Sequence, residues 1–217
     1  MLRRYFLVSY ALFLLLHFNL NAQVTVDFKT TSDTTGCGSL QASFCADASS
    51  TEGNIVKYSW TLGGIKSSLE CPGRIFGTPG AYTICLEVTD EKGNKAKKCK
   101  EDHIKVFALP QPDFDARSTQ GCAPLEVVFE DQSTTTDGKI TKWTWGLGGS
   151  SSVIIDDGTA TEIKTIYTLP DNYSVNLTVE DENGCTNTIS KDDFVNIFPD
   201  PEIVVSTQDT FSCAAPY

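Results

Sequence analysis

The sequence predicts an all-β protein built from tandem, two-sheet antiparallel β-sandwiches. Three observations lead to this fold class: the sequence repeats itself after 85 to 91 residues, apolar and polar residues alternate along short segments, and no helical apolar stripe occurs after residue 22. The chain has 217 residues, of which 40% are hydrophobic and 21% are charged. This composition is that of a globular protein and argues against a disordered or fibrous chain.

Residues 1–22 have the layout of a secretory signal peptide. Arg3 and Arg4 precede an apolar run from Tyr5 to Phe18, which is shorter than the roughly 20 residues that a membrane-spanning helix needs. We expect cleavage after Ala22, with an uncleaved anchor as the alternative, and no transmembrane segment in the mature chain. The expected localisation is therefore secreted or at the cell surface. Export also accounts for the eight cysteines as disulfide formers, and because none are spaced as Cys-x-x-Cys we expect no zinc site.

Two repeats follow and define the predicted domains. Landmarks early in the first repeat recur 85 residues later, and those late in it recur 91 residues later. The early set is Gly36-Cys37, Leu40, Phe44 and Trp60 against Gly121-Cys122, Leu125, Phe129 and Trp145; the late set is Tyr82, Leu86, Val88, Asp90 and Gly93 against Tyr173, Leu177, Val179, Asp181 and Gly184. The second repeat thus has six extra residues, which we assign to the loop at Ser150–Gly158. The predicted sandwiches span 23–109 and 110–199.

The pattern restarts after residue 199, because Cys213-Ala214-Ala215-Pro216 resembles Cys122-Ala123-Pro124. We therefore expect residues 200–217 to begin a third repeat that is truncated here, and the native protein to be longer. The linkers Leu109–Pro112 and Pro199–Pro201 contain prolines, which fix φ and make short, stiff joints.

Within each repeat, alternating segments such as Thr83–Val88 predict strands with one buried face. Glycine-containing turns at Asp90–Asn94 and Asp181–Gly184 lie between such segments and indicate hairpins. About seven short strands fit each repeat, as in a two-sheet sandwich. We expect Trp60 and Trp145 to fill the space between the sheets, with ligand stacking as the alternative.

The second repeat reads Gly-Cys-x-Pro-Leu-x-Val-x-Phe, then Trp-x-Trp before a glycine turn, then Tyr-x-Val-x-Leu-x-Val and Asn-Gly-Cys. This pattern resembles the PKD (polycystic-kidney-disease) domain. The resemblance is carried in the second repeat by Gly121, Cys122, Pro124, Leu125, Val127, Phe129, Trp143, Trp145, Tyr173, Val175, Leu177, Val179, Asn183, Gly184 and Cys185, and in the first by Gly36, Cys37, Leu40, Phe44, Trp60, Tyr82, Ile84, Leu86 and Val88. The family's Trp-Asp-Phe-Gly-Asp-Gly turn lacks both aspartates in both repeats, so no role of those carboxylates is carried over.

The resemblance implies an extracellular, Ig-like sandwich without enzymatic activity. Its cysteine-bearing form is similar to repeats in secreted, gliding-motility-associated, adhesin-like surface proteins of Bacteroidetes-type bacteria. We therefore expect modules that adhere to a protein or polysaccharide at the cell surface, or that act as stiff spacers. The alternative is a set of accessory repeats of a secreted hydrolase, a protease or a polysaccharide-degrading enzyme, whose catalytic domain is absent here.

The cysteines are expected to brace these sandwiches. Cys122 opens a strand and Cys185 follows the last hairpin turn, so we expect both at the same end of the second sandwich and predict a Cys122–Cys185 disulfide. Cys85 and Cys99 are equidistant from Lys92 at the centre of a hairpin. Cross-strand neighbours lie within bridging range, which predicts Cys85–Cys99.

A third bridge is predicted between Cys45, which points outward after inward-facing Phe44, and Cys71, which precedes a neighbouring strand. Cys37 is then left over, and the partner of Cys213 would lie beyond residue 217. A Cys37–Cys99 pair is the alternative that would overturn this scheme.

The formal net charge of -11 arises in the second half, where residues 112–200 hold sixteen acidic and five basic residues. Nucleic acid is not expected as a partner, because it requires a basic face. We expect the acids at Glu180–Glu182, Asp156-Asp157 and Asp192-Asp193 to be solvated. Calcium at a loop or a joint between repeats is the alternative, and otherwise no cofactor is expected.

The remaining candidates are a histidine and a group of lysines. His103, the one histidine after residue 22, has no nucleophile motif around it, so no catalytic, cofactor-binding or metal-ligating residue is predicted. Five lysines crowd the last hairpin of the first repeat, and we expect them to block sheet pairing at an edge. The alternative is docking onto an acidic surface, a polysaccharide or the second repeat. The five are Lys92, Lys95, Lys97, Lys98 and Lys100.

Overall fold

The computed structural model describes residues 23–149, 152–155 and 162–202, with the backbone alone described in 152–155. Every regular element within these residues is a β-strand. Accordingly, this part of the chain contains no helix long and apolar enough to cross a membrane. The predicted signal peptide, residues 203–217 of the predicted third repeat with Cys213, and the aspartates at 156 and 157 lie outside the described residues.

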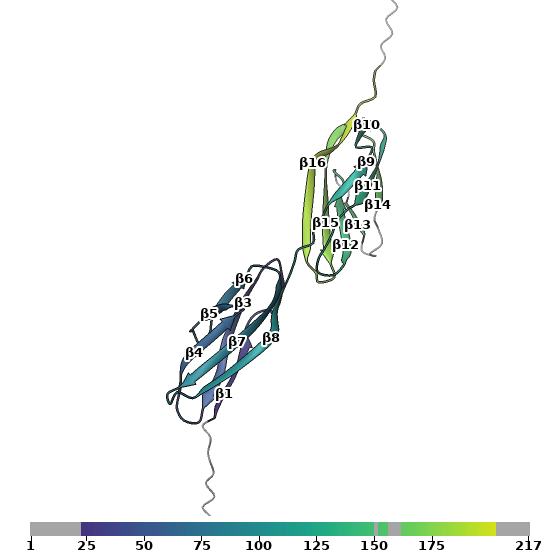
Figure 1. Ribbon diagram of the computed structural model, residues 1–217. Helices are drawn as coiled ribbons and strands as arrows, with labels where there is room; N and C mark the ends of the chain where they lie inside the picture. Colours follow the sequence, from purple (N-terminus) through teal and green to yellow (C-terminus); the bar gives the residue numbers. More distant parts are fainter. Residues whose placement is uncertain (1–22, 150–151, 156–161, 203–217) are drawn as a thin grey trace, which may run out of the picture. The chain divides into compact units, whose positions relative to one another are not determined.

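The first sandwich consists of eight strands in two sheets (Figure 1). The three-stranded sheet has the order β1-β3-β6, and the five-stranded sheet has the order β2-β8-β7-β4-β5. The strands are β1 (Val24–Thr30), β2 (Thr35–Cys37), β3 (Leu40–Ser50), β4 (Ile55–Leu62), β5 (Ile65–Ser67), β6 (Gly73–Phe76), β7 (Gly80–Asp90) and β8 (Lys95–Phe107).

The second sandwich repeats this topology. Its sheets have the orders β14-β11-β9 and β10-β16-β15-β12-β13. The strands are β9 (Phe114–Arg117), β10 (Gln120–Cys122), β11 (Leu125–Asp131), β12 (Ile140–Gly146), β13 (Ser152–Ile155), β14 (Glu162–Tyr167), β15 (Asp171–Asp181) and β16 (Thr186–Phe198). The chain is therefore all-β with two sandwiches, as the repeats and the alternation predict.

Each five-stranded sheet contains one parallel pair, which the antiparallel prediction missed. β2 runs parallel to the end of β8, with Cys37 opposite Phe107. β10 runs parallel to the end of β16, with Cys122 opposite Phe198. Both short strands have three residues, which is too few for a pattern of alternation to reveal the pairing.

The two tryptophans lie between the sheets, as predicted, with exposed fractions of 0% for Trp60 and 1% for Trp145. Trp60 of β4 meets Phe28 of β1 edge-on at 5.3 Å between ring centroids. Trp145 of β12 meets Phe114 of β9 at the same separation. Such pairs contribute about 0.5–1.5 kcal/mol beyond the area they bury. The rings are thus part of the core and unavailable for stacking on a ligand.

A lysine from the last strand of each sandwich also joins the two sheets. The Lys100 ammonium lies 3.1 Å from the Asp27 carboxylate and donates a hydrogen bond of 2.6 Å to the carbonyl oxygen of Phe28. Lys191 makes the corresponding ion pair with Asp113 at 3.0 Å. Lys100 therefore has a structural partner, which the edge-blocking prediction did not foresee.

The other four lysines of the first hairpin agree better with the prediction that they block sheet pairing at an edge. Lys92, Lys95, Lys97 and Lys98 are exposed. In the described residues, β2 pairs with β8 along Lys105–Phe107, so the earlier part of β8 has an open outer side. Lysines along such an edge oppose pairing with another strand.

Two disulfides lie within the first sandwich, and both are predicted pairs. Cys45 of β3 is bonded to Cys71, which precedes neighbouring β6, and Cys85 of β7 is bonded to Cys99 of β8. The Cα atoms are 4.1 Å apart in each pair. Adjacent strands place these side chains within reach of each other.

The predicted Cys122–Cys185 disulfide is wrong. Cys185 is bonded to Cys37, which is therefore not left over, and Cys122 is an exposed free thiol. Cys122 lies beside the last residue of β16, whereas Cys185 directly precedes the first. The strand separates them by about 40 Å at about 3.3 Å per residue. They lie at opposite ends of the sandwich, because β10 pairs with the far end of β16.

Candidate functional site

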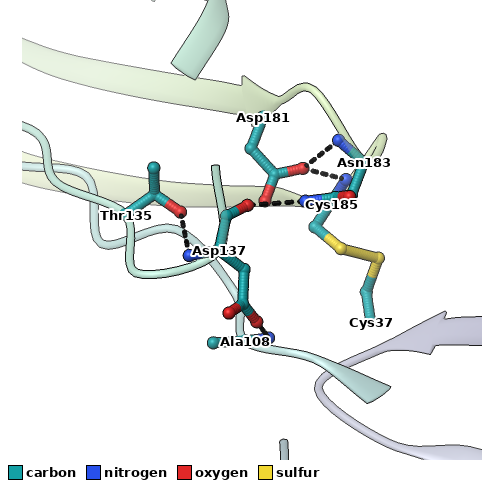
Figure 2. The surroundings of a disulfide bond; sticks show 7 residues. All are labelled: Cys37, Ala108, Thr135, Asp137, Asp181, Asn183 and Cys185. Carbon is teal, nitrogen blue, oxygen red and sulfur yellow. Dashed lines mark hydrogen bonds between the residues drawn. A yellow bond between two sulfur atoms is a disulfide. The ribbon is translucent and has the colours of Figure 1, made fainter. Parts of the chain in front are cut away.

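The Cys37–Cys185 disulfide connects the two repeats covalently across 148 residues of sequence. Its Cα atoms are 5.5 Å apart, and both cysteines belong to the same compact unit of the chain. Within the described part of the chain, no group of three or more His, Cys, Asp or Glu side chains could hold a metal ion. The candidate site is therefore this covalent joint and the residues around it (Figure 2).

Cys37 is held at the end of the first sandwich from which the linker leaves. The N–H of Gly38 donates a hydrogen bond of 2.7 Å to the carbonyl oxygen of Phe107, the last residue of β8. Gly38 has a φ of 68°, a conformation that glycine adopts without steric cost. The tight turn after Cys37 thus fixes this cysteine beside the residue that leads into the linker.

Cys185 is held by the β15–β16 hairpin of the second repeat. One carboxylate oxygen of Asp181 accepts hydrogen bonds from the backbone N–H groups of Asn183 and Cys185, both at 2.9 Å. Gly184 takes the positive φ of 79° that the turn requires. Cys185 is fully buried, and Asp181 is 2% exposed. Asp181 therefore organises the turn and is not the solvated acid that its acidic neighbours suggest.

The first repeat builds the same hairpin with a different last residue. Asp90 accepts hydrogen bonds from the backbone N–H groups of Lys92 and Asn94 at 2.9 and 2.8 Å. Its other oxygen accepts from the Ser50 hydroxyl at 2.7 Å and from the Asn94 side-chain amide at 3.0 Å. The Ser50 hydrogen bond, followed by those from Asn94 and Lys92, lowers the pKa of Asp90 to about 2.

The second oxygen of Asp181 lacks these donors. It is buried and has no hydrogen-bond partner among the described residues. Cys185 occupies the place of Asn94, so its side chain forms a disulfide with Cys37 instead of donating to the carboxylate. The second repeat's hairpin, with cysteine where the first has asparagine, is thus cross-linked to the preceding repeat.

A loop of the second repeat connects the hairpin to the linker. The Asn183 side-chain amide donates to the carbonyl oxygen of Asp137 at 2.5 Å. The carboxylate of Asp137 in turn accepts the N–H of Ala108 at 2.6 Å (Figure 2). Ala108 is the first residue after β8, so Asp137 binds the start of the linker.

Two further contacts hold the linker against the second repeat. Gln111 and Thr134 exchange backbone hydrogen bonds of 2.7 and 2.9 Å. The Asn187 side chain donates to the carbonyl oxygen of Pro110 at 2.9 Å. The prolines alone predict a stiff linker, and these contacts with a hairpin and a loop supply additional restraint.

The remaining candidates do not join this site. His103 is partly buried on β8, and Asp192 and Asp193 are exposed near the middle of β16. The joint itself was missed, although the sequence held a signal for it. Asn94 stands where the second repeat has Cys185, which leaves Cys37 without a partner inside its own repeat.

Comparison with known proteins agrees with this architecture. The family model of the PKD domain matches residues 23–106 and again 108–197. The chain belongs to the PKD domain family. The two matches account for both sandwiches.

Similar proteins include a much larger protease. The pre-pro-metalloprotease PrtV of Vibrio cholerae is 27% identical over 146 residues, which are 66% of this chain and 15% of that protein. The chain thus spans less than a fifth of this curated relative. Among solved structures, the PKD1 domain of Vibrio anguillarum Epp is 27% identical, with 38% of this chain and 94% of that domain covered and a TM-score of 0.34. The PKD1 domain of PrtV is 25% identical, with 41% and 98% covered and a TM-score of 0.34.

Proposed function

We propose that residues 23–109 and 110–199 are non-catalytic modules of an exported bacterial surface protein, coupled by a disulfide into a stiff pair. The pair adheres to a protein or polysaccharide at the cell surface or holds a distal binding region away from it, in the gliding-motility-associated setting that the sequence resemblance suggests. The observation that carries the proposal is the Cys37–Cys185 bond. The signal-peptide pattern of residues 1–22 supports export.

The physical argument concerns the number of connections between the repeats. A linker by itself is one covalent connection, about which two folded modules can rotate and swing. The Cys37–Cys185 disulfide is a second connection, and the hydrogen bonds to Ala108, Pro110 and Gln111 restrain the first. Two connections remove most of the freedom that one leaves, which suits a module that must transmit force or keep a distance.

The test compares the tumbling of the two repeats in solution. In a Cys122→Ser, Cys213→Ser background, ¹⁵N relaxation should give both repeats of residues 23–217 the same rotational correlation time. Adding Cys37→Ser and Cys185→Ser should shorten the correlation times and make them differ, because the repeats then reorient separately. A Cys45→Ser, Cys71→Ser pair in the same background is the matched control, since it removes a disulfide within one sandwich. Independent tumbling of the repeats with Cys37–Cys185 intact would contradict the proposal.

The similarity to PrtV favours a second candidate function. In this second candidate the modules serve as accessory repeats of a secreted hydrolase, because that relative is named as a metalloprotease and the chain covers 15% of it. The reading frame after residue 217 distinguishes the two. Further repeats followed by a sorting domain support the surface protein, and a catalytic domain supports the hydrolase.

A further inference from the structure

Cys122 stands out because it is an exposed free thiol in a chain whose other described cysteines are all bonded. Its local setting matches that of Cys37. Cys37 ends a three-residue strand parallel to β8 and lies opposite Phe107, the last residue of that strand. Cys122 ends a three-residue strand parallel to β16 and lies opposite Phe198, the last residue of that strand.

The hydrogen bonds around the two cysteines match as well. The residue after Cys37 donates its N–H to the carbonyl oxygen of Phe107 at 2.7 Å, and Ala123, after Cys122, donates to that of Phe198 at 3.1 Å. Each cysteine also follows a glycine against which a leucine packs, Leu40 in the first repeat and Leu125 in the second. The two positions are therefore structurally equivalent, and one of them is already bonded to the next repeat.

The position of the disulfide partner can be compared between the repeats in the same way. Cys37 is bonded to the cysteine of the Asn183-Gly184-Cys185 turn, in the hairpin of the repeat that comes after it. The first repeat has Asn94 at the corresponding place in its own hairpin, where the side chain donates to Asp90. The first repeat thus supplies a cysteine to the joint that follows it and has no hairpin cysteine for a joint before it. The second repeat has both.

We infer that Cys122 forms a disulfide with the hairpin cysteine of a third PKD repeat. In this arrangement, the cysteine at the linker end of one repeat is bonded to the cysteine in the last hairpin of the next. The sequence after Phe198 restarts the repeat pattern, with Cys213 at the place of Cys122. This inference deepens the proposed function, on which it rests, by naming the partner of the second repeat's free thiol.

The bond forms by thiol–disulfide exchange. The Cys122 thiolate attacks a sulfur of an oxidised disulfide donor, such as a disulfide oxidoreductase or a small-molecule disulfide, and one donor thiol leaves. The hairpin thiolate then displaces the second donor sulfur from Cys122. Two protein thiols become one disulfide, and the donor is reduced to two thiols.

The test adds a third repeat in the register of the first joint. Residues 23–198 are followed directly by a second copy of residues 108–217, which reproduces the Phe107–Ala108 junction. The copy carries Thr186→Ser as a mass label next to its Cys185, and Cys122→Ser and Cys213→Ser so that its only free thiol is that cysteine. Non-reducing peptide mapping should link Cys122 to the labelled peptide and Cys37 to the unlabelled one.

A matched chain has Cys185→Asn in the copy, the residue that the first repeat uses. Cys122 should then react fully with maleimide, whereas it should be protected in the parent chain. Hydrogen exchange of the copy's β15–β16 hairpin verifies that the third repeat is folded. Full maleimide reaction of Cys122 in the parent chain, whose third repeat is folded and keeps its Cys185, overturns the inference. So does a Cys122–Cys185 link in the two-repeat chain, because that link would mean that Cys37 is not the normal partner.

Failure here is distinguishable from failure of the proposed function. The relaxation experiment depends on Cys37–Cys185 in a background without Cys122. The two repeats can therefore tumble together while Cys122 stays free, and that pair of results would leave the stiff pair intact and reject the extended cross-linking.

Discussion

At the scale of single residues, the last hairpins of the two repeats share one turn geometry and differ at its final residue, Asn94 in the first and Cys185 in the second. Asp90 and Asp181 are both buried at the start of the last hairpin and both accept two backbone N–H groups. Asn94 completes the first turn with its amide, and Cys185 uses its sulfur to reach Cys37. Burial of a carboxylate is tolerated where such donors replace its water.

The lowered pKa of Asp90 predicts a pH dependence of stability. A carboxyl whose pKa falls from 3.8 to about 2 on folding stabilises the native state above the unfolded-state pKa. This stabilisation is lost as the pH falls from about 4 to about 2. Asp90→Asn should therefore lower the unfolding free energy at pH 7 and change it little at pH 2. Urea unfolding at both values measures this, with exposed Asp33→Asn as the control. An equal loss at both values would mean that the charge of Asp90 is unimportant.

At the scale of elements, the same contacts join the two sheets of each sandwich. Lys191 of β16 forms an ion pair with Asp113 at 3.0 Å and places its ammonium 4.4 Å from the ring centroid of Phe114. Lys100 makes the matching contacts with Asp27 and Phe28 in the first sandwich. The hydrogen bond from Lys191 and that from the N–H of Phe114 lower the pKa of Asp113. A single side chain from the last strand thus fastens the first strand of the opposite sheet.

Removing this charge should loosen the second sandwich. Lys191→Met keeps the length of the side chain but loses the ion pair with Asp113, the hydrogen bond that the ammonium donates to the carbonyl oxygen of Phe114, and the contact of the cation with the Phe114 ring. We expect the unfolding free energy to fall by about 1–2 kcal/mol. Urea unfolding followed by tryptophan fluorescence measures the change, and Lys164→Met, at an exposed position on β14, is the control. If both variants lose the same amount, the Lys191 contacts contribute nothing specific.

At the scale of the whole molecule, the repeats carry different surfaces on one topology. Residues 23–111 hold ten acidic and ten basic residues, whereas residues 112–200 hold sixteen and five. The joint draws on both repeats, with Cys37 from one, and Cys185, Asn187 and Asp137 from the other. Specialisation of the surfaces can therefore proceed while the connection between the modules stays the same.

The linker contacts give a prediction at this scale. Asp137→Ala removes the acceptor of the Ala108 N–H, so the amide of Ala108 should exchange with solvent faster, by tenfold for each 1.4 kcal/mol that local opening becomes easier. Amide hydrogen exchange read by NMR checks this, with Asp192→Ala, at an exposed position on β16, as the control. Unchanged exchange at Ala108 would show that the disulfide holds the linker without Asp137.

The elements with a strong local pattern could be predicted from the sequence. Alternation along Thr83–Val88 identifies a half-buried strand, and the spacing of Cys85 and Cys99 about a hairpin places them opposite each other. Trp60 and Trp145 were predicted in the core for the same reason. Each of these inferences needs only neighbours that are close in sequence or across one turn.

The sequence by itself determined that this chain is a tandem of PKD-type sandwiches with disulfides. Only the tertiary structure decided which end of a sandwich each cysteine occupies. β2 and β10 have three residues each, so no periodicity shows that they run parallel to the far ends of β8 and β16. That pairing takes Cys122 away from Cys185 and brings Cys37 to the joint. Local pattern encodes strands, whereas the partner of a cysteine 148 residues away depends on how the sheets are assembled.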